Sequence, residues 1–315
     1  MKHYLTRFSF LILLLYTLSQ TAFAARLLIP GGQVIGMHLA DGTVTVTGLT
    51  DEGKHTGLAA GDRLLTIDGA PVSCAEDVRN ALSRSDGTVN ISLLRGEKTK
   101  HLTLRPTVTA DGPRLGVLLR QGTTGLGTVT YYENDTFGAL GHGINDPTGK
   151  LLPMESGSVY EATVSGVKQG KTGAPGQLLG AVTRQEATGS LFKNTHQGVF
   201  GSAPAAATQP LPAATAQDVH PGKATIRSTV SDAGLREYSV EILKIYPNAQ
   251  NKTRNMLIRV TDPALLSATG GIVQGMSGSP IIQDGKLIGA VTHVLVNDPT
   301  MGYGIFIENM LDAAA

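Results

Sequence analysis

The sequence contains few cysteines and few aromatic residues. Among its 315 residues there is no Trp, aromatic side chains make up 5%, and Cys74 is the only cysteine. A single cysteine excludes an intrachain disulfide and any cysteine-rich metal site. Because Cys74 lies in a stretch with helical spacing, we expect a small packed side chain there and not a reactive thiol.

The chain also lacks an excess of charge of either sign. It carries 26 Lys and Arg against 25 Asp and Glu, a formal net charge of +1, with no long basic run. This balance argues against nucleic acid as a partner. The sequence has no His-Glu-x-x-His zinc motif, no Walker loop and no Gly-x-Gly-x-x-Gly after a strand. No metal, nucleotide or other cofactor is therefore expected.

The first 24 residues have the pattern of an export signal. A basic start, Met1–Arg7, precedes the apolar run Phe8–Leu18, and the small residues Ala22 and Ala24 follow. The alternative is an uncleaved anchor, because an apolar run shorter than the roughly 20 residues of a bilayer span can still associate with a membrane transiently. Residues 1–24 therefore predict export across a membrane, followed by secretion or transient membrane association.

Glycine is abundant, with 39 residues, and short alternating segments separate the glycine-rich turns. This pattern predicts a mostly β protein, and the length predicts two domains. We place the first domain at residues 27–106. In it Gly42–Thr47 alternates with period two, and Glu76–Leu82 has helical spacing. Val89–Leu94 and Lys100–Leu104 alternate as the two strands of a hairpin.

One segment of the first domain, Gly57–Gly69, resembles the PDZ domain signature. A turn of small residues leads through Gly61 and Asp62 into a strand that ends in Ile67-Asp68-Gly69. The resemblance implies that residues 27–106 form a PDZ domain.

PDZ domains bind a peptide by adding it as a strand to a sheet edge, and backbone N–H groups of a loop capture its carboxylate. By the resemblance, that loop is expected at Val34, Ile35, Gly36 and Met37, with Ser73–Ser83 as the helix beside the groove. The ligand is expected to be a peptide segment of this chain or of a partner. The alternative is a PDZ-like fold that serves only as a rigid spacer.

The second predicted domain covers residues 107–315. Its many short alternating segments, among them Arg236–Leu243 and Lys286–Thr292, predict barrels or a sandwich. Gly201–Gln217 is rich in Ala, Pro and Thr and has no periodicity. We expect it to be a surface loop between two halves of this domain.

The segment Gly275–Pro280 resembles the nucleophile turn of chymotrypsin-like serine proteases and makes Ser277 the candidate nucleophile. Gly275 allows a tight bend, so that the N–H groups of Gly275 and Ser277 can form an oxyanion hole. Ser279 is the weaker candidate, because it occupies the second glycine position of the pattern. A turn without catalytic function is the alternative.

A serine nucleophile needs a base, and His142 is the candidate because glycines on both sides leave its imidazole accessible. The alternative is a histidine held in a turn by backbone hydrogen bonds. His196, His220 and His293 have less distinctive contexts, although His293 follows the nucleophile closely enough to line the cleft.

The base needs an acid to orient it. Four aspartates lie between His142 and Ser277 and are candidates for this role: Asp146, Asp218, Asp232 and Asp262. Asp262 is preferred because it ends the predicted strand Met256–Val260 and gives the chain order His, Asp, Ser. The alternative is a helix N-cap, since Pro263 follows it at the first position of a predicted helix.

The export signal, the PDZ segment, Gly141–Gly143 and Gly270–Pro280 follow one another as in the stage IV sporulation protein B peptidase family. The similarity extends through Gly289–His293 and Asn297–Gly304 and covers nearly the whole chain. It implies a PDZ domain followed by a chymotrypsin-like double β-barrel serine peptidase domain.

By this resemblance His142 is the base, Ser277 the nucleophile and Asp262 the acid. The family implies a signalling endopeptidase of spore-forming bacteria that enters the space between the forespore membranes and processes itself. There it cleaves the ectodomain of a regulatory subunit of a membrane protease, which leads to activation of a late sigma factor. A non-catalytic adaptor and an envelope quality-control protease are the alternatives, although the latter usually carries its peptidase domain before its PDZ domains.

Overall fold

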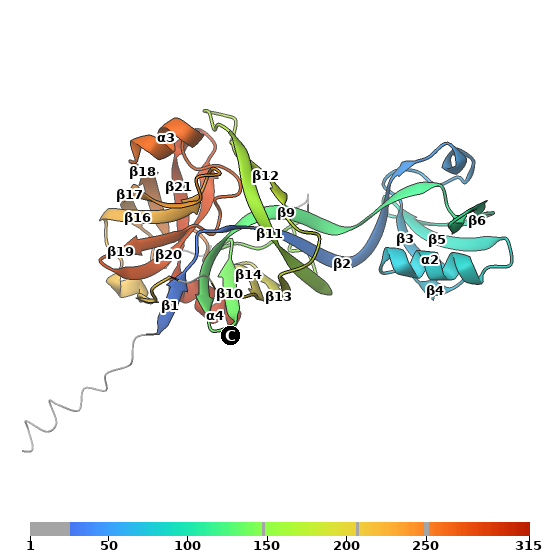
Figure 1. The fold of residues 1–315 in the computed structure, drawn as a ribbon, viewed down its shortest axis with the longest axis horizontal. Coiled ribbons are helices and arrows are strands. Elements are labelled where there is room, and N and C mark those ends of the chain that lie inside the picture. Colours follow the sequence, from blue (N-terminus) through green and yellow to red (C-terminus); the bar gives the residue numbers. More distant parts are fainter. Residues whose placement is uncertain (1–25, 147–148, 206–207, 249–251) are drawn as a thin grey trace, which may run out of the picture.

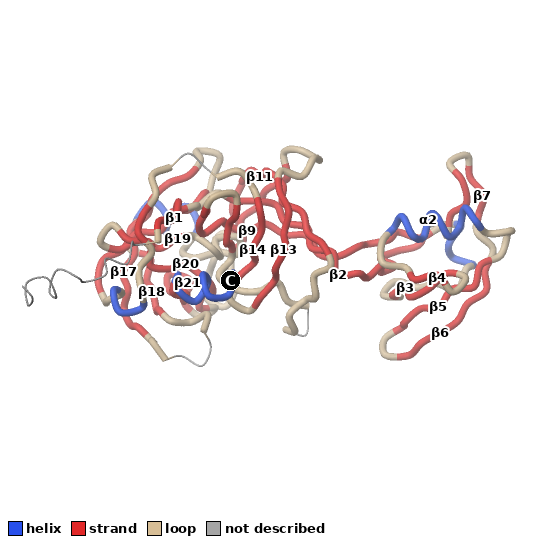
Figure 2. The backbone as a smooth tube through the Cα atoms, turned by 90° about the horizontal axis from the view of Figure 1, so that it is seen from below, coloured by secondary structure: helices blue, strands red, loops and turns tan. Residues whose placement is uncertain are grey.

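A computed structural model describes residues 26–315, except 147–148, 206–207 and 249–251. The predicted export signal at 1–24 lies outside the described residues. In the part that is described, no helix is long and apolar enough to cross a bilayer. The chain is mostly β, as predicted, and forms two lobes joined by a narrow bridge of two strands (Figure 1 and Figure 2).

The larger lobe contains two barrels. In the first, six strands pair in a closed ring in the order β2-β9-β10-β14-β13-β11 and back to β2. Outside the ring, β1 pairs with β9, and β12 pairs with β11. The strands are β1 Leu27–Pro30, β2 Val34–Leu49, β9 Val117–Glu133, β10 Thr136–Ala139, β11 Ser156–Lys168, β12 Gln177–Val182, β13 Gly189–Thr195 and β14 Gly198–Ser202. Buried side chains such as Val129, Phe137 and Val159 form its core.

The second barrel is closed in the order β16-β17-β18-β21-β20-β19. Its elements are β16 Gly222–Thr229, β17 Leu235–Ile245, β18 Met256–Val260, α3 Pro263–Thr269, β19 Pro280–Gln283, β20 Lys286–Leu295, β21 Asp298–Phe306 and α4 Ile307–Ala314. Alternate residues of β16 point into the barrel, so that Ala224, Ile226 and Ser228 are buried. The double β-barrel predicted from the resemblance is therefore confirmed.

The smaller lobe is the predicted PDZ domain. Between β2 and β9 it contains η1 Glu52–His55, β3 Arg63–Ile67, β4 Ala70–Pro71, α2 Ala75–Arg84, β5 Val89–Arg95, β6 Lys98–Leu104, β7 Thr107–Thr109 and β8 Gly112–Arg114. The hairpin of β5 and β6 and the helix α2 are where the sequence predicted them. In the signature segment, the fully buried Asp62 accepts two hydrogen bonds from Arg95, each 2.6 Å long, and one from the Ala59 N–H. This bidentate pair closes the turn before β3.

The predicted division into residues 27–106 and 107–315 is wrong, because β2 and β9 run through both lobes. The first half of β2 pairs with the second half of β9 in the barrel, and the remaining halves pair in the PDZ domain. The register shifts at the junction, where Gly42 and Gly122 have φ values of 70° and 66°. The PDZ domain is therefore an insertion into the first barrel.

The predicted carboxylate loop, Val34, Ile35, Gly36 and Met37, is also misplaced. These residues lie in the barrel half of β2, with β9 along one edge and β11 along the other. A strand with partners on both edges has no backbone groups left for a peptide. The prediction that these four residues bind a carboxylate is therefore wrong.

Residues 201–217 connect the two barrels, as the sequence predicted. Within this segment β15, Leu211–Pro212, pairs with β1, and the 3₁₀ turn η2 covers Ala216–Asp218. The N–H of Ala214 donates to the carbonyl of Leu287 in β20 at 2.9 Å. The segment is thus fixed to both barrels.

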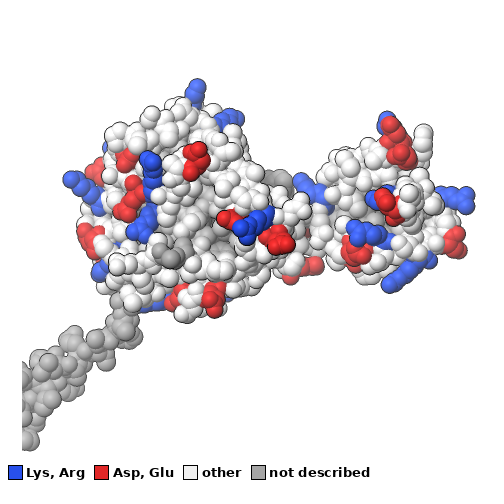
Figure 3. Space-filling view, viewed as in Figure 1, with Lys and Arg blue, Asp and Glu red and all other residues white. Residues whose placement is uncertain are grey.

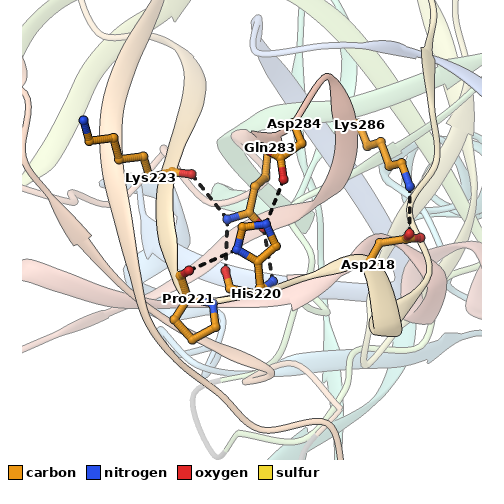
Figure 4. A network of polar contacts seen from close by, with 7 residues as sticks. All are labelled: Asp218, His220, Pro221, Lys223, Gln283, Asp284 and Lys286. Atoms are coloured by element: carbon orange, nitrogen blue, oxygen red, sulfur yellow. Dashed lines mark hydrogen bonds and ion pairs between the residues drawn. The ribbon is translucent and has the colours of Figure 1, made fainter.

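A polar network fastens the entry to β16 onto the β19–β20 hairpin (Figure 4). His220 Nε2 lies 2.8 Å from the Asp284 carboxylate, and the Gln283 amide donates to the His220 carbonyl at 2.9 Å. Beside them Lys286 pairs with Asp218 at 2.7 Å, which lowers the pKa of that carboxyl to about 2. His220 and Asp218, two candidates from the sequence, therefore have structural roles on the barrel surface.

Candidate active site

His142 and Ser277 line the same cavity, which has a volume of about 480 Å³. His142 follows β10 of the first barrel, and Ser277 precedes β19 of the second. The structure thus brings the predicted base and nucleophile together from distant parts of the chain. Within the described residues no hydrogen bond joins the two side chains.

Two glycines shape the turn that carries Ser277. Gly275 and Gly278 have φ values of 98° and 96°, a backbone region that favours glycine. A Cβ atom on Gly278 would lie 2.0 Å from the carbonyl oxygen of Thr128. The glycines of the nucleophile pattern are therefore required by the close approach of this turn to β9.

Two buried threonines of β9 hold the nucleophile turn. The Thr128 hydroxyl donates to the Gly275 carbonyl at 2.7 Å, and the Thr128 N–H donates to the Ser277 carbonyl at 3.1 Å. The Thr130 hydroxyl donates to the Gly278 carbonyl at 2.8 Å. Sequence reasoning missed these residues because threonines alternating in a strand look like ordinary β propensity.

The turn leaves two backbone donors without acceptors. The N–H groups of Met276, Gly278 and Ser279 bond to backbone carbonyls. Among the described residues, the N–H groups of Gly275 and Ser277 have no such partner. These are the two donors that the sequence predicted for an oxyanion hole.

The two candidate serines have different environments. Ser279 is fully buried, and its hydroxyl donates to Ser228 at 3.1 Å. Ser277 lines the cavity, and its hydroxyl donates to the Thr292 carbonyl at 2.8 Å. Only Ser277 is accessible to a substrate, and its hydroxyl must rotate away from Thr292 before it can reach a base.

His142 follows a turn with a strained backbone, and hydrogen bonds fix its ring and the residues after it. Leu140 and Gly141 both have φ values of 68°, which turn the chain after β10. His142 Nδ1 lies 2.9 Å from the Gly143 carbonyl oxygen. The Asn194 side chain makes hydrogen bonds of 2.9 and 3.0 Å to the backbone N–H and carbonyl of Ile144 and fixes the chain after the histidine. Burial lowers the pKa of His142, and its bond to the Gly143 carbonyl opposes that shift.

His293 lies beside His142 in the same cavity, with 5.2 Å between the ring centroids. Burial lowers its pKa to about 4, and the neighbouring positive charges of His142 and Arg254 add to the effect. His293 is therefore neutral at neutral pH. Its place beside His142 is not evident from the sequence, because a histidine inside a strand has no distinctive context.

Asp262 is not brought to His142 in this structure. Its carboxylate accepts hydrogen bonds from the N–H groups of Ala264 and Leu265, at 2.9 and 3.1 Å, as the N-cap of α3. A third bond comes from the Ser239 N–H at 3.3 Å. These contacts match the capping alternative that the sequence left open. The orienting partner of His142 here is the carbonyl of Gly143.

The described residues contain no group of three or more His, Cys, Asp or Glu that could hold a metal ion. The polar side chains of the cavity include the Ser277 hydroxyl and the His142 imidazole, the kinds of group used in nucleophilic catalysis.

Comparison with known proteins agrees with this geometry. The family model of the SpoIVB peptidase S55 matches residues 112–311, which include both His142 and Ser277. The chain belongs to this family. It is a serine peptidase.

Other matches of this S55 peptidase are partial. A protein of Rhizobium meliloti (strain 1021), described as a zinc metalloprotease, is 30% identical over 111 residues, which cover 34% of this chain and 30% of that protein. The PDZ domain of the SdrC-like protein from Listeria monocytogenes is 25% identical and covers 24% of this chain and 85% of that domain, with a TM-score of 0.22. The active form of the Rv3671c protease from M. tuberculosis is 16% identical and covers 61% and 75% of the two chains, with a TM-score of 0.35.

The hydrogen bonds of Thr128 generate the first prediction. Thr128→Val should lower activity by at least about tenfold, because the Gly275 carbonyl loses its donor and the oxyanion donors shift. The unfolding free energy should fall by about 1–3 kcal/mol, since a buried carbonyl is left unpaired. Peptide hydrolysis and thermal unfolding measure the two effects.

Thr136→Val is the matched control for this experiment. The Thr136 hydroxyl also donates to a backbone carbonyl, that of Glu133, but it is exposed and remote from the cavity. Equal activity losses in the two variants would contradict the role assigned to Thr128.

The capping contacts of Asp262 generate the second prediction. Asp262→Ala should lower the unfolding free energy by about 1 kcal/mol, whereas Asp262→Ser should keep most of the stability because serine is an equally good N-cap. Denaturant unfolding measures the difference. In the stable Asp262→Ser variant, a loss of activity by orders of magnitude would show that the carboxylate also acts on His142 in another conformation.

Proposed function

We propose that this peptidase is an exported signalling endopeptidase that processes itself and cleaves the ectodomain of a regulatory subunit of a membrane protease. By the resemblance, the cleavage triggers activation of a late sigma factor during sporulation, in the space between the forespore membranes. Membership of the peptidase family supports the chemistry. The observation that carries the proposal is the cavity shared by His142 and Ser277, with two free N–H donors in the nucleophile turn.

The geometry supports a direct catalytic sequence. The Gly143 carbonyl can only accept a hydrogen bond, so His142 carries its proton on Nδ1 and keeps a lone pair on Nε2. Ser277 rotates from Thr292 to this nitrogen and gives up its proton as Oγ attacks the peptide carbonyl. The N–H groups of Gly275 and Ser277 bind the oxyanion, and protonated His142 passes its proton to the leaving amine. Water then hydrolyses the acyl-enzyme by the same route.

The PDZ insertion supports regulated cleavage over digestion. A cavity of about 430 Å³ lies between α2 and the PDZ half of β9, lined by Val78 and Leu82 on the helix and by Leu115, Val117 and Leu119. In this half β9 pairs with β2 along one edge only. This groove, and not Val34–Met37, is therefore the candidate peptide site. A peptide of this chain or of a partner would add to the free edge of β9 as a strand.

A non-catalytic adaptor is the second candidate. One observation favours it: the Ser277 hydroxyl donates its hydrogen bond to the Thr292 carbonyl and not to His142. A fluorophosphonate probe separates the two functions, because it labels only an activated serine.

The peptidase assignment predicts that Ser277→Ala lowers self-cleavage and peptide hydrolysis by at least about 10⁴-fold and abolishes fluorophosphonate labelling. Ser279→Ala is the control: it removes a buried hydroxyl that faces Ser228, so activity should persist with a loss of stability of about 1 kcal/mol. Mass spectrometry of the fragments over time provides the measurement. Undiminished cleavage by Ser277→Ala would rule out the proposed nucleophile.

The depressed pKa of His142 predicts the pH dependence of the reaction. A general base must be neutral, and burial lowers the pKa of His142 below its ordinary value of 6.5. The rate should therefore rise with pH to a plateau, and the midpoint of the rise in kcat/KM should lie below pH 6.5. A pH profile measured at constant ionic strength tests this, and a midpoint well above pH 6.5 would contradict the base assignment.

A further inference from the structure

The catalytic cavity adjoins a second one. The second cavity has a volume of about 700 Å³ and runs along β12 of the first barrel. The two cavities share four lining residues: Met37, Thr124, Gly125 and Leu126. The catalytic cleft is therefore longer than the space around Ser277 and His142.

Both cavities are free of charged side chains. Charged residues make up 16% of the sequence and are scattered over both lobes on the face shown in Figure 3. Among the described residues that line either cavity, none is Asp, Glu, Lys or Arg. Arg254, whose charge acts on His293, lies over the Tyr303 ring and lines neither cavity. A charged substrate side chain inside either cavity would meet no side chain of opposite charge among the Asp, Glu, Lys and Arg residues, since none lines it.

Apolar side chains are exposed where the cleft opens. Of the seven large apolar side chains exposed in the described residues, three line the two cavities. Val296 is 48% exposed at the catalytic cavity, and Leu179 and Val182 are 47% and 45% exposed at the second. Below them Ile272 and Val273 are buried in the wall beside Ser277. Exposed apolar side chains gathered along a cleft mark a binding surface.

The wall of the catalytic cavity is fixed in position. The Ile272 N–H donates to the Pro299 carbonyl at 2.8 Å, and the Gln274 N–H donates to the Gly176 carbonyl at 2.9 Å. A Cβ atom on Gly302 would lie 2.6 Å from Ile272 Cδ1, so the isoleucine packs directly onto the β21 backbone. A wall this closely packed has a defined shape and does not adapt to a charged group by rearranging.

Two strand edges border the cleft. Beyond Val291, β20 pairs with β21 along one edge, and its pairing with β19 ends at Ala290. Among the described strands, β12 pairs only with β11, and on its other edge only the start is bonded, where the Leu178 N–H donates to the Gln274 carbonyl at 2.8 Å. Unpaired edges of this kind bind an extended peptide through its main chain and leave its side chains to select the sequence.

We propose that the peptidase selects an extended, uncharged segment rich in aliphatic side chains, which lies along both cavities with its scissile bond at Ser277. This inference rests on the proposed peptidase function and adds the class of substrate. It also marks Val296 and Leu179 as residues that determine specificity.

The test uses the full-length protein and a library of synthetic peptides of equal length, with cleavage sites read by mass spectrometry. Aliphatic residues should be enriched around the cleaved bond, and a single Asp or Lys near it should lower kcat/KM by at least about tenfold. Peptides cleaved equally well with and without such charges would overturn the proposal.

Three matched variants test which residues of the cleft determine the substrate preference. Val296→Asp and Leu179→Asp each place a carboxylate in one cavity at a position that tolerates it, because both side chains are already half exposed. Each variant should shift the preference at nearby substrate positions towards Lys by about tenfold. Phe192→Asp is the control, because Phe192 is 53% exposed on β13 of the first barrel and lines neither cavity. An unchanged preference in both cleft variants would overturn the proposal.

The outcomes distinguish this inference from the proposed function. If Ser277 reacts with a fluorophosphonate and peptides are cleaved without regard to charge, the substrate class is wrong and the peptidase function stands. If Ser277 is not labelled and no peptide is cleaved, both are wrong.

Discussion

All three polar groups of Thr128 connect the two halves of the active site. Its hydroxyl and its N–H donate to the nucleophile turn at Gly275 and Ser277, and its carbonyl accepts from the N–H of Leu140 at the turn before His142. The base belongs to one barrel and the nucleophile to the other. Thr128 therefore bonds to both turns at once and, together with Thr130, holds the nucleophile turn with its two free N–H donors.

The strand that carries Thr128 serves three sites along its length. Its first residues line the PDZ groove, Thr124–Leu126 line both parts of the cleft, and Thr128 and Thr130 hold the nucleophile turn. An inserted domain is usually joined by flexible linkers that allow it to move freely. Here both connections are paired strands, and the binding domain and the peptidase share backbone hydrogen bonds. This is why the order of domains along the chain does not describe their arrangement in space.

Local chemistry made some features predictable from the sequence. Ser277 and His142 stand among glycines that a tight turn requires, and the hairpin of β5 and β6 alternates cleanly around its turn. The division into domains could not be predicted, because β2 passes from one domain to the other as one continuous strand. The same continuity made the barrel residues Val34–Met37 resemble a PDZ loop. The role of Thr128 depends on contacts between barrels, which local patterns do not contain.

The polar contacts of the site describe a resting enzyme. The Ser277 hydroxyl is bonded to Thr292, and Nδ1 of His142 is bonded to a neutral carbonyl. A carbonyl orients the imidazole and fixes its tautomer, but it stabilises the imidazolium less than a carboxylate does. Asp262 caps α3 with one carboxylate oxygen and accepts from the Ser239 N–H with the other, so it could supply that charge only after a rearrangement that brings it to His142. Catalysis then waits for a rearrangement that substrate binding can drive.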